Sequence, residues 1–163
     1  MVWKFLIALK KQPVVSVMLL RHINRCVDPE RGNPKRWNQR KGDAQMSKFV
    51  FVLTRGLEDP TRVTRTFQLA KAAHENGHEV GLFLTDDGVV LAKKGMADNV
   101  VAPTGDDAGS HLYYLVENKV PIYVWIPCAE ARQVGEQAIV ESAVLAGAPK
   151  LFEISEGANV LTF

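Results

Sequence analysis

The segment DPTRVTRTFQLAKAAHENGHEVGLFLT, residues 59–85, places a helix, a helix end and a strand one after another. Asp59 provides an N-cap acceptor, and Pro60 suits the first helical position because the N–H that it lacks would have no partner there. Apolar residues then recur at helical spacing until Gly77, which is typical of a residue that ends a helix. The continuous apolar run that follows, residues 78–85, predicts a buried strand.

The same alternation continues on both sides of this stretch. Short apolar runs predict further strands at residues 48–53, 98–103, 120–125 and 158–163, and helices are expected at residues 86–95, near residues 106–119 and from Cys128 onward. Continuously apolar strands that alternate with helices predict right-handed βαβ units. The expected fold is therefore an α/β class, with three α/β/α layers and a mainly parallel sheet of about five strands.

Composition narrows the possible functions. The chain has 163 residues, with 47% hydrophobic and 23% charged content, which is typical of a globular protein with one substantial core. Its two cysteines, Cys26 and Cys128, form neither a disulfide framework nor a metal-ligand pattern, which predicts a reduced cytoplasmic setting and no metal. No glycine motif for a nucleotide cofactor is present, and no apolar run approaches the ~20 residues of a membrane span.

Charge divides the chain at Met46. Residues 1–45 hold ten Lys and Arg against three Asp and Glu, a balance of +7, and residues 46–163 hold ten against fifteen, a balance of −5. The acidic part lacks interleaved basic and aromatic residues, which argues against nucleic-acid binding. The breaker-rich, charged stretch at residues 26–45 predicts a disordered basic leader ahead of a domain at residues 46–163.

Three interpretations of the leader remain open. It is a disordered tail, or WKFLIALKK is a short basic amphipathic helix for a membrane or partner surface, or the leader is translated upstream sequence and no part of the natural protein. The third is favoured because MSKFVFVLT opens directly into a strand at Met46. One spelling of the Lys41, Gly42 and Asp43 codons also contains AAGGAG, a bacterial ribosome-binding sequence.

Chemistry in parallel sheets gathers at the carboxyl ends of the strands. Three loops leave those ends: TRGLEDP, TDDGVV and WIPCAEAR. In the last of these, Cys128 is expected in the first turn of a helix, where free N–H groups favour a thiolate, and Arg132 follows one turn later as a supporting positive charge. The alternative is that Cys128 is a small apolar residue in the corner between strand and helix.

Two other polar groups are candidates of a weaker kind. Asp86, Asp87 and Gly88 are interpreted either as a polar cluster facing the same edge or as turn and cap residues, with Asp87 starting the short helix. A second group lies in the helix expected near residues 106–119: His111, Tyr113 and Tyr114. These residues are interpreted either as the lining of a pocket or subunit contact, or as ordinary helix packing.

From Lys48 to Phe163 the sequence resembles the DsrE/DsrF-like family of small α/β proteins, which includes sulfur-relay subunits. The matching pieces, in order, are EDPTRVTRTFQLAKAAHENGHEVGLFLTDDGVVLAKKG, VPIYVWIPCAEAR and AVLAGAPKLFEISEGANVLTF. The resemblance implies a flavodoxin-like three-layer domain that assembles as trimers, hexamers or related rings. It also implies a cysteine that carries sulfane sulfur. In sulfur-relay members this cysteine tends to stand where Trp125 is here, whereas Cys128 corresponds to the second cysteine of a Cys-x-x-Cys arrangement.

Two functional hypotheses follow. In the first, the protein is a cytoplasmic homo-oligomer, at most a sulfurtransferase-type carrier, which passes sulfur from a donor protein to an acceptor protein through Cys128, supported by Arg132. In the second, it is a non-catalytic homo-oligomeric module that binds a small ligand and whose Cys128 is inert. The expected ligand-binding positions are Asp87, Gly88, Trp125 and Pro127. No cofactor, membrane or nucleic acid is expected under either hypothesis.

Overall fold

The computed structural model describes residues 46–163. The predictions made for residues 1–45, including the basic leader and its three interpretations, lie outside the described residues. Within residues 46–163, no helix has the length and apolar character needed to cross a membrane.

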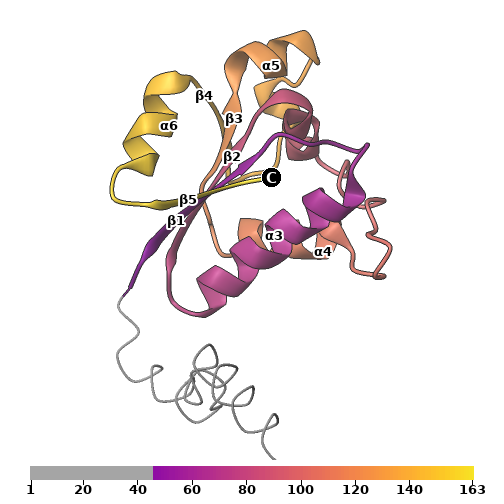
Figure 1. Cartoon of the computed structure of the whole chain (residues 1–163). Helices are drawn as coiled ribbons and strands as arrows, with labels where there is room; N and C mark the ends of the chain where they lie inside the picture. Colours follow the sequence, from indigo (N-terminus) through magenta and orange to yellow (C-terminus); the bar gives the residue numbers. More distant parts are fainter. Residues whose placement is uncertain (1–45) are drawn as a thin grey trace, which may run out of the picture. The chain divides into compact units, whose positions relative to one another are not determined.

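A single five-stranded sheet forms the centre of the domain (Figure 1). Its strands are β1 (Lys48–Leu53), β2 (Glu79–Leu84), β3 (Ile122–Trp125), β4 (Ala143–Ala146) and β5 (Asn159–Thr162). They stand in the order β4-β3-β2-β1-β5, and every neighbouring pair is parallel. The all-parallel sheet confirms the α/β class predicted from the alternating elements.

Helices cover both faces of this sheet, which gives the predicted three-layer, flavodoxin-like architecture. The helical elements are α3 (Pro60–Glu75), the 3₁₀ segment η2 (Asp86–Ala92), α4 (Ala108–Glu117), α5 (Ile126–Ala131), the 3₁₀ turn η3 (Glu136–Ala138) and α6 (Ala148–Ser155). Figure 1 shows α3 and α4 side by side on one face and α6 on the other.

The two faces are packed very unequally. The larger core lies under α3 and α4, where Phe51, Phe67 and Leu84 are at most 1% exposed. The smaller core lies under α6 and gathers Val50, Phe83, Ala146 and Ile154. Because one short helix covers that second face, apolar side chains stay exposed on and around it, among them Phe152 on α6 and Val160 on β5.

Local sequence signals explain most of the element boundaries. Asp59 caps α3 by accepting a hydrogen bond from the backbone N–H of Arg62, at 3.0 Å, and Pro60 is the first helical residue. Gly77 has a φ of 80°, in the left-handed region that favours glycine, just after α3 ends. Asp107 caps α4 in the same way as Asp59 caps α3.

One predicted strand was wrong, and one real strand was missed. Residues 98–103 are not a strand; Val101 alone forms an isolated antiparallel bridge, with Asp107. The fourth strand is instead β4, with the sequence AVLA. It is an edge strand that pairs along its whole length with β3, so this one neighbouring strand supplies the stability that its own alanines do not.

The unequal packing predicts opposite results for two phenylalanines of the same size. Phe67 is 0% exposed and Phe152 is 73% exposed. We expect Phe67→Ala to lower the free energy of unfolding by about 3–5 kcal/mol, through lost burial and the cavity left behind. Within a single copy of the chain, Phe152→Ala should change it by no more than about 0.5 kcal/mol. Urea unfolding followed by circular dichroism, at protein concentrations too low for self-association, measures both, and equal losses would contradict the assignment of the core.

Candidate functional site

Two loops from neighbouring strands are bound together at the carboxyl edge of the sheet. The loop after β2 donates backbone hydrogen bonds to the end of β1: Thr85 N–H to the Leu53 carbonyl at 3.0 Å, and Asp87 N–H to the Thr54 carbonyl at 3.2 Å. These bonds fix the start of η2 against the first loop. The two loops therefore act as one rigid edge.

Two glycines allow this close approach. A Cβ added to Gly88 would lie 2.6 Å from the Leu53 carbonyl oxygen, and one added to Gly56 would lie 2.5 Å from the Asp87 carbonyl oxygen. Both distances are shorter than van der Waals contact, and both neighbours are backbone atoms that have little freedom to move. Gly88, predicted as a ligand-binding position, is buried in this packing.

Cys128 lies on the third element that reaches this edge. Helix α5 begins at Ile126, two residues before the predicted start at Cys128, which places Pro127 second and Cys128 third, still within the first turn. Trp125 precedes the helix and provides no side-chain cap. The half-buried sulfur packs against the larger core. Its Sγ lies 4.0 Å from the Thr85 hydroxyl and 3.9 Å from Oδ1 of Asp86.

Asp86 reaches the sulfur from an unusual backbone conformation. Its φ is 49°, in the left-handed region where aspartate is tolerated better than most residues that carry a side chain. The short helix begins at Asp86 after Thr85, and Asp87 is not its cap as predicted. The turn therefore directs the carboxylate of Asp86 to the thiol and the carboxylate of Asp87 elsewhere.

Asp87 is held by Arg132. The guanidinium donates two hydrogen bonds to Oδ1 of Asp87, from Nη2 at 2.6 Å and from Nε at 3.0 Å. The bond to Asp87 raises the pKa of Arg132 above its usual value, and the neighbouring Cys128 and Asp86 act in the same direction. Arg132 was predicted to be a supporting positive charge for Cys128. The structure places its guanidinium in hydrogen-bond contact with Asp87, and its interaction with Cys128 is one of charge without a hydrogen bond.

The remaining predicted positions are spread around this edge. Trp125 is half-buried and its ring lies 5.9 Å from that of Phe83, measured between centroids. Pro127 is exposed beside Cys128. The group on α4 makes its contacts elsewhere: the hydroxyl of Tyr113 donates to Asp98 at 2.6 Å, and that of Tyr114 lies 3.2 Å from Nδ1 of His74.

Two residues at the site were missed by the sequence prediction. Thr85 was included in a strand, and Asp86 was treated as one member of a turn, yet these two contact the sulfur. The available signal was the run TDDG at the end of a buried strand. Within residues 46–163, no group of three or more His, Cys, Asp or Glu side chains is arranged to hold a metal ion.

The path of the chain also marks this edge. After β3 it turns toward the face with the larger core, through α5, and after β4 it turns toward the opposite face, through α6 (Figure 1). Adjacent strands whose loops leave in opposite directions are where parallel α/β sheets place ligands. The protein is thus a small parallel α/β sandwich with a thiol at the carboxyl edge of its sheet.

Comparison with known families agrees with this class. The model of the DsrE/DsrF-like family matches residues 47–163, and the chain belongs to that family. Among solved structures, the ychN protein from E. coli has a TM-score of 0.62 at 22% identity, over 72% of this chain and 100% of that one. That likeness shows the fold.

The related sequences carry no assigned activity. An uncharacterized protein of Methanocaldococcus jannaschii, MJ0989, is 30% identical over 120 residues, covering 71% of this chain and 99% of its own length. A second one from that organism, MJ0760, is 29% identical over 116 residues, and the match spans only 42% of its length. An uncharacterized protein of Methanopyrus kandleri, MK0008, is 30% identical over 106 residues, covering 63% of this chain and 82% of its own length.

The packing of the two loops predicts a strong effect at one glycine. We expect Gly88→Ala to destabilise the protein by about 1–3 kcal/mol, because the new methyl group meets the Leu53 carbonyl. Gly135→Ala is the matched control, since nothing lies within 4 Å of a Cβ added there. Thermal unfolding of the two variants compares them. A Gly88 variant as stable as the Gly135 variant would show that the loops are not tightly packed.

Proposed function

We propose that the protein carries sulfane sulfur on Cys128, passing it from a donor persulfide to an acceptor thiol. The observation that supports this most directly is the position of the thiol. It lies half-buried in the first turn of α5, at the carboxyl edge of a parallel sheet, in a member of the DsrE/DsrF-like family. Free cysteines are more often buried and inert, so a thiol held at this edge is the feature to be explained.

The proposed chemistry consists of two balanced sulfur transfers without net oxidation. The Cys128 thiolate attacks the outer sulfur of the donor persulfide; a new bond forms between Sγ and that sulfur, the S–S bond of the donor breaks, and the donor leaves as a thiolate. The acceptor thiolate then attacks the same outer sulfur, and Cys128 leaves as a thiolate. Each step needs a deprotonated attacking thiol, so the charges around the sulfur set its rate.

Two of the groups around Cys128 suit such a carrier. The Thr85 hydroxyl, 4.0 Å from Sγ, is placed to donate a weak hydrogen bond to a sulfur that carries negative charge. Arg132 neutralises Asp87, so one of the two adjacent carboxylates is compensated by an ion pair. In this proposal Arg132 is a positioning residue whose effect on the thiol is indirect.

We also propose that the protein works as a homo-oligomer, a trimer or hexamer, in the cytoplasm. Exposed apolar residues around the thinly covered face support self-association: Phe152 is 73% exposed, Val144 51% and Val160 46%. Membership of the family supports it as well. The sulfur donor and acceptor are proposed to be separate proteins that reach the edge where Cys128 lies.

Persulfide loading of the full chain tests the carrier function. After incubation with a small persulfide donor and removal of the excess, we expect the peptide that contains Cys128 to gain the mass of one sulfur atom. Cys128→Ser should remove this gain while leaving the circular dichroism spectrum unchanged, and Cys26→Ser should retain it. A folded protein whose Cys128 takes up no sulfur would instead favour the hypothesis of a ligand-binding module with an inert thiol.

The indirect role of Arg132 predicts a rescue. Arg132→Gln leaves both Asp86 and Asp87 uncompensated, so we expect alkylation of Cys128 by neutral iodoacetamide to slow by about two- to ten-fold at low salt. Adding Asp87→Asn to that variant should restore the rate, whereas adding Glu141→Gln, at the opposite edge of the sheet, should not. A direct contact between guanidinium and thiolate would leave the loss unrepaired by Asp87→Asn.

A further inference from the structure

One carboxylate next to Cys128 forms no ion pair among the residues that the structure describes. Asp86 and Asp87 are neighbours in sequence, but Arg132 binds Asp87 alone. Within residues 46–163, the carboxylate of Asp86 forms no ion pair and its one hydrogen-bond contact is with Sγ of Cys128, at 3.9 Å. Two carboxylates against one guanidinium leave a net charge of minus one beside the thiol.

We infer that Asp86 makes Cys128 selective for sulfur donors and acceptors that carry a positive charge next to the reacting sulfur. This inference rests on the proposed function, because it names the chemical class of partner for the same site. An approaching cation would be attracted by the Asp86 carboxylate, and an anion would be repelled by it. Asp86 would then be a specificity-determining residue, acting on whatever reacts with Cys128.

The backbone holds this carboxylate in place. Residue 86 is in the left-handed region with a φ of 49°, and the peptides on either side of it are bound to the first loop through Thr85 and Asp87. The side chain therefore leaves a turn that backbone hydrogen bonds hold against the end of β1. The carboxylate is also exposed, so a partner that reaches the sulfur meets it in water-accessible space.

The other charged groups nearby do not cancel this negative charge. Glu58 in the first loop is turned to its own backbone, with both carboxylate oxygens 2.9–3.0 Å from the Gly56 N–H. Glu130 on α5 is exposed and adds one negative charge, and Arg55 in the first loop is exposed and adds one positive charge, so these two balance each other. Of all these groups, Asp86 is the one in contact with Sγ, so it dominates the charge that a reacting sulfur encounters.

Small disulfides measure this selectivity directly. In each reaction the Cys128 thiolate attacks one sulfur, forms a mixed disulfide and releases one thiolate. The probes are cystamine, which is cationic, bis(2-hydroxyethyl) disulfide, which is neutral, and 3,3′-dithiodipropionate, which is anionic. The full chain is used at low ionic strength, and mass spectrometry of the Cys128 peptide gives the rate of each adduct separately from any reaction at Cys26.

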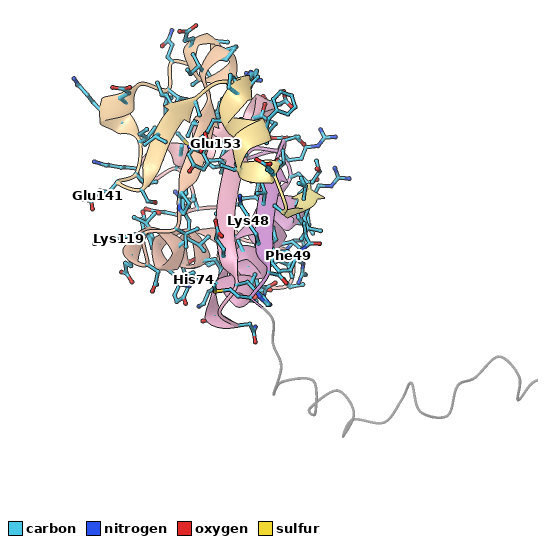
Figure 2. All side chains as sticks on the ribbon, turned by 90° about the vertical axis from the view of Figure 1, so that its left-hand side faces the viewer. Lys48, Phe49, His74, Lys119, Glu141 and Glu153 are labelled. Carbon is cyan, nitrogen blue, oxygen red and sulfur yellow. The ribbon has the colours of Figure 1, made fainter. Side chains whose placement is uncertain are left out.

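The comparison is made between variants, which cancels the intrinsic reactivity of each probe. We expect the ratio of cationic to anionic rates to fall by about three- to ten-fold in Asp86→Asn relative to the unmodified sequence, and the fall to shrink as salt is added. Asparagine has the same shape and also tolerates the left-handed region, so this variant removes charge alone. Glu141→Gln, which removes one charge at the amino edge of the sheet (Figure 2), should leave the ratio unchanged.

Two results would overturn the inference: an Asp86→Asn ratio equal to that of the unmodified sequence, or a folded protein whose Cys128 reacts with none of the three probes. Neither depends on sulfur transfer. If the protein takes up no sulfane sulfur but shows a charge preference that Asp86→Asn abolishes, the inference about selectivity stands and the carrier function is rejected. Sulfur uptake with equal ratios in both proteins would reject the selectivity alone.

Discussion

The contact on which the site depends is the packing of two backbones at Gly56 and Gly88. Each glycine lies against a carbonyl of the opposite loop, at a distance that leaves no room for a Cβ. The hydrogen bonds from Thr85 and Asp87 to the end of β1 can form only because the loops approach this closely. This packing holds the turn at Asp86 in place. The turn then determines where the carboxylates of Asp86 and Asp87 lie relative to Cys128.

Sequence reasoning predicted the fold well where one signal decided an element locally. Asp59 and Pro60 start α3, Gly77 follows its end, and β1 has the predicted bounds. It failed where stability comes from neighbours. The sequence of β4, AVLA, has only one β-branched residue, and the strand exists because β3 pairs with all of it. The apolar residues near Val101, with a better strand pattern, pair with no strand of the sheet and form a single bridge, between Val101 and Asp107.

In the candidate site, too, the features decided by local sequence could be predicted, and those decided by tertiary packing could not. That Cys128 would stand in a first helical turn could be predicted from a strand followed by a proline. The partner of Arg132 could not be predicted from the sequence. Whether its guanidinium meets Cys128 or Asp87 depends on how η2 lies against α5. These two elements are separated by about forty residues of chain and are brought together only by tertiary packing. The role of Asp86 was hidden for a similar reason: its contact follows from a positive φ that aspartate adopts in a minority of turns.

The difference between positions 125 and 128 now has a structural meaning. The ring of Trp125, at the end of β3, lies near Phe83 and packs against both cores of the domain. Cys128 packs against the larger core and faces the loop after β2, where its sulfur contacts Asp86. The two side chains therefore share the larger core, and the thiol at position 128 has the turn at Asp86 as a neighbour. A thiol at position 128 lies beside Asp86, Asp87 and Arg132, and we propose that these charges, rather than the strand end, set its reactivity.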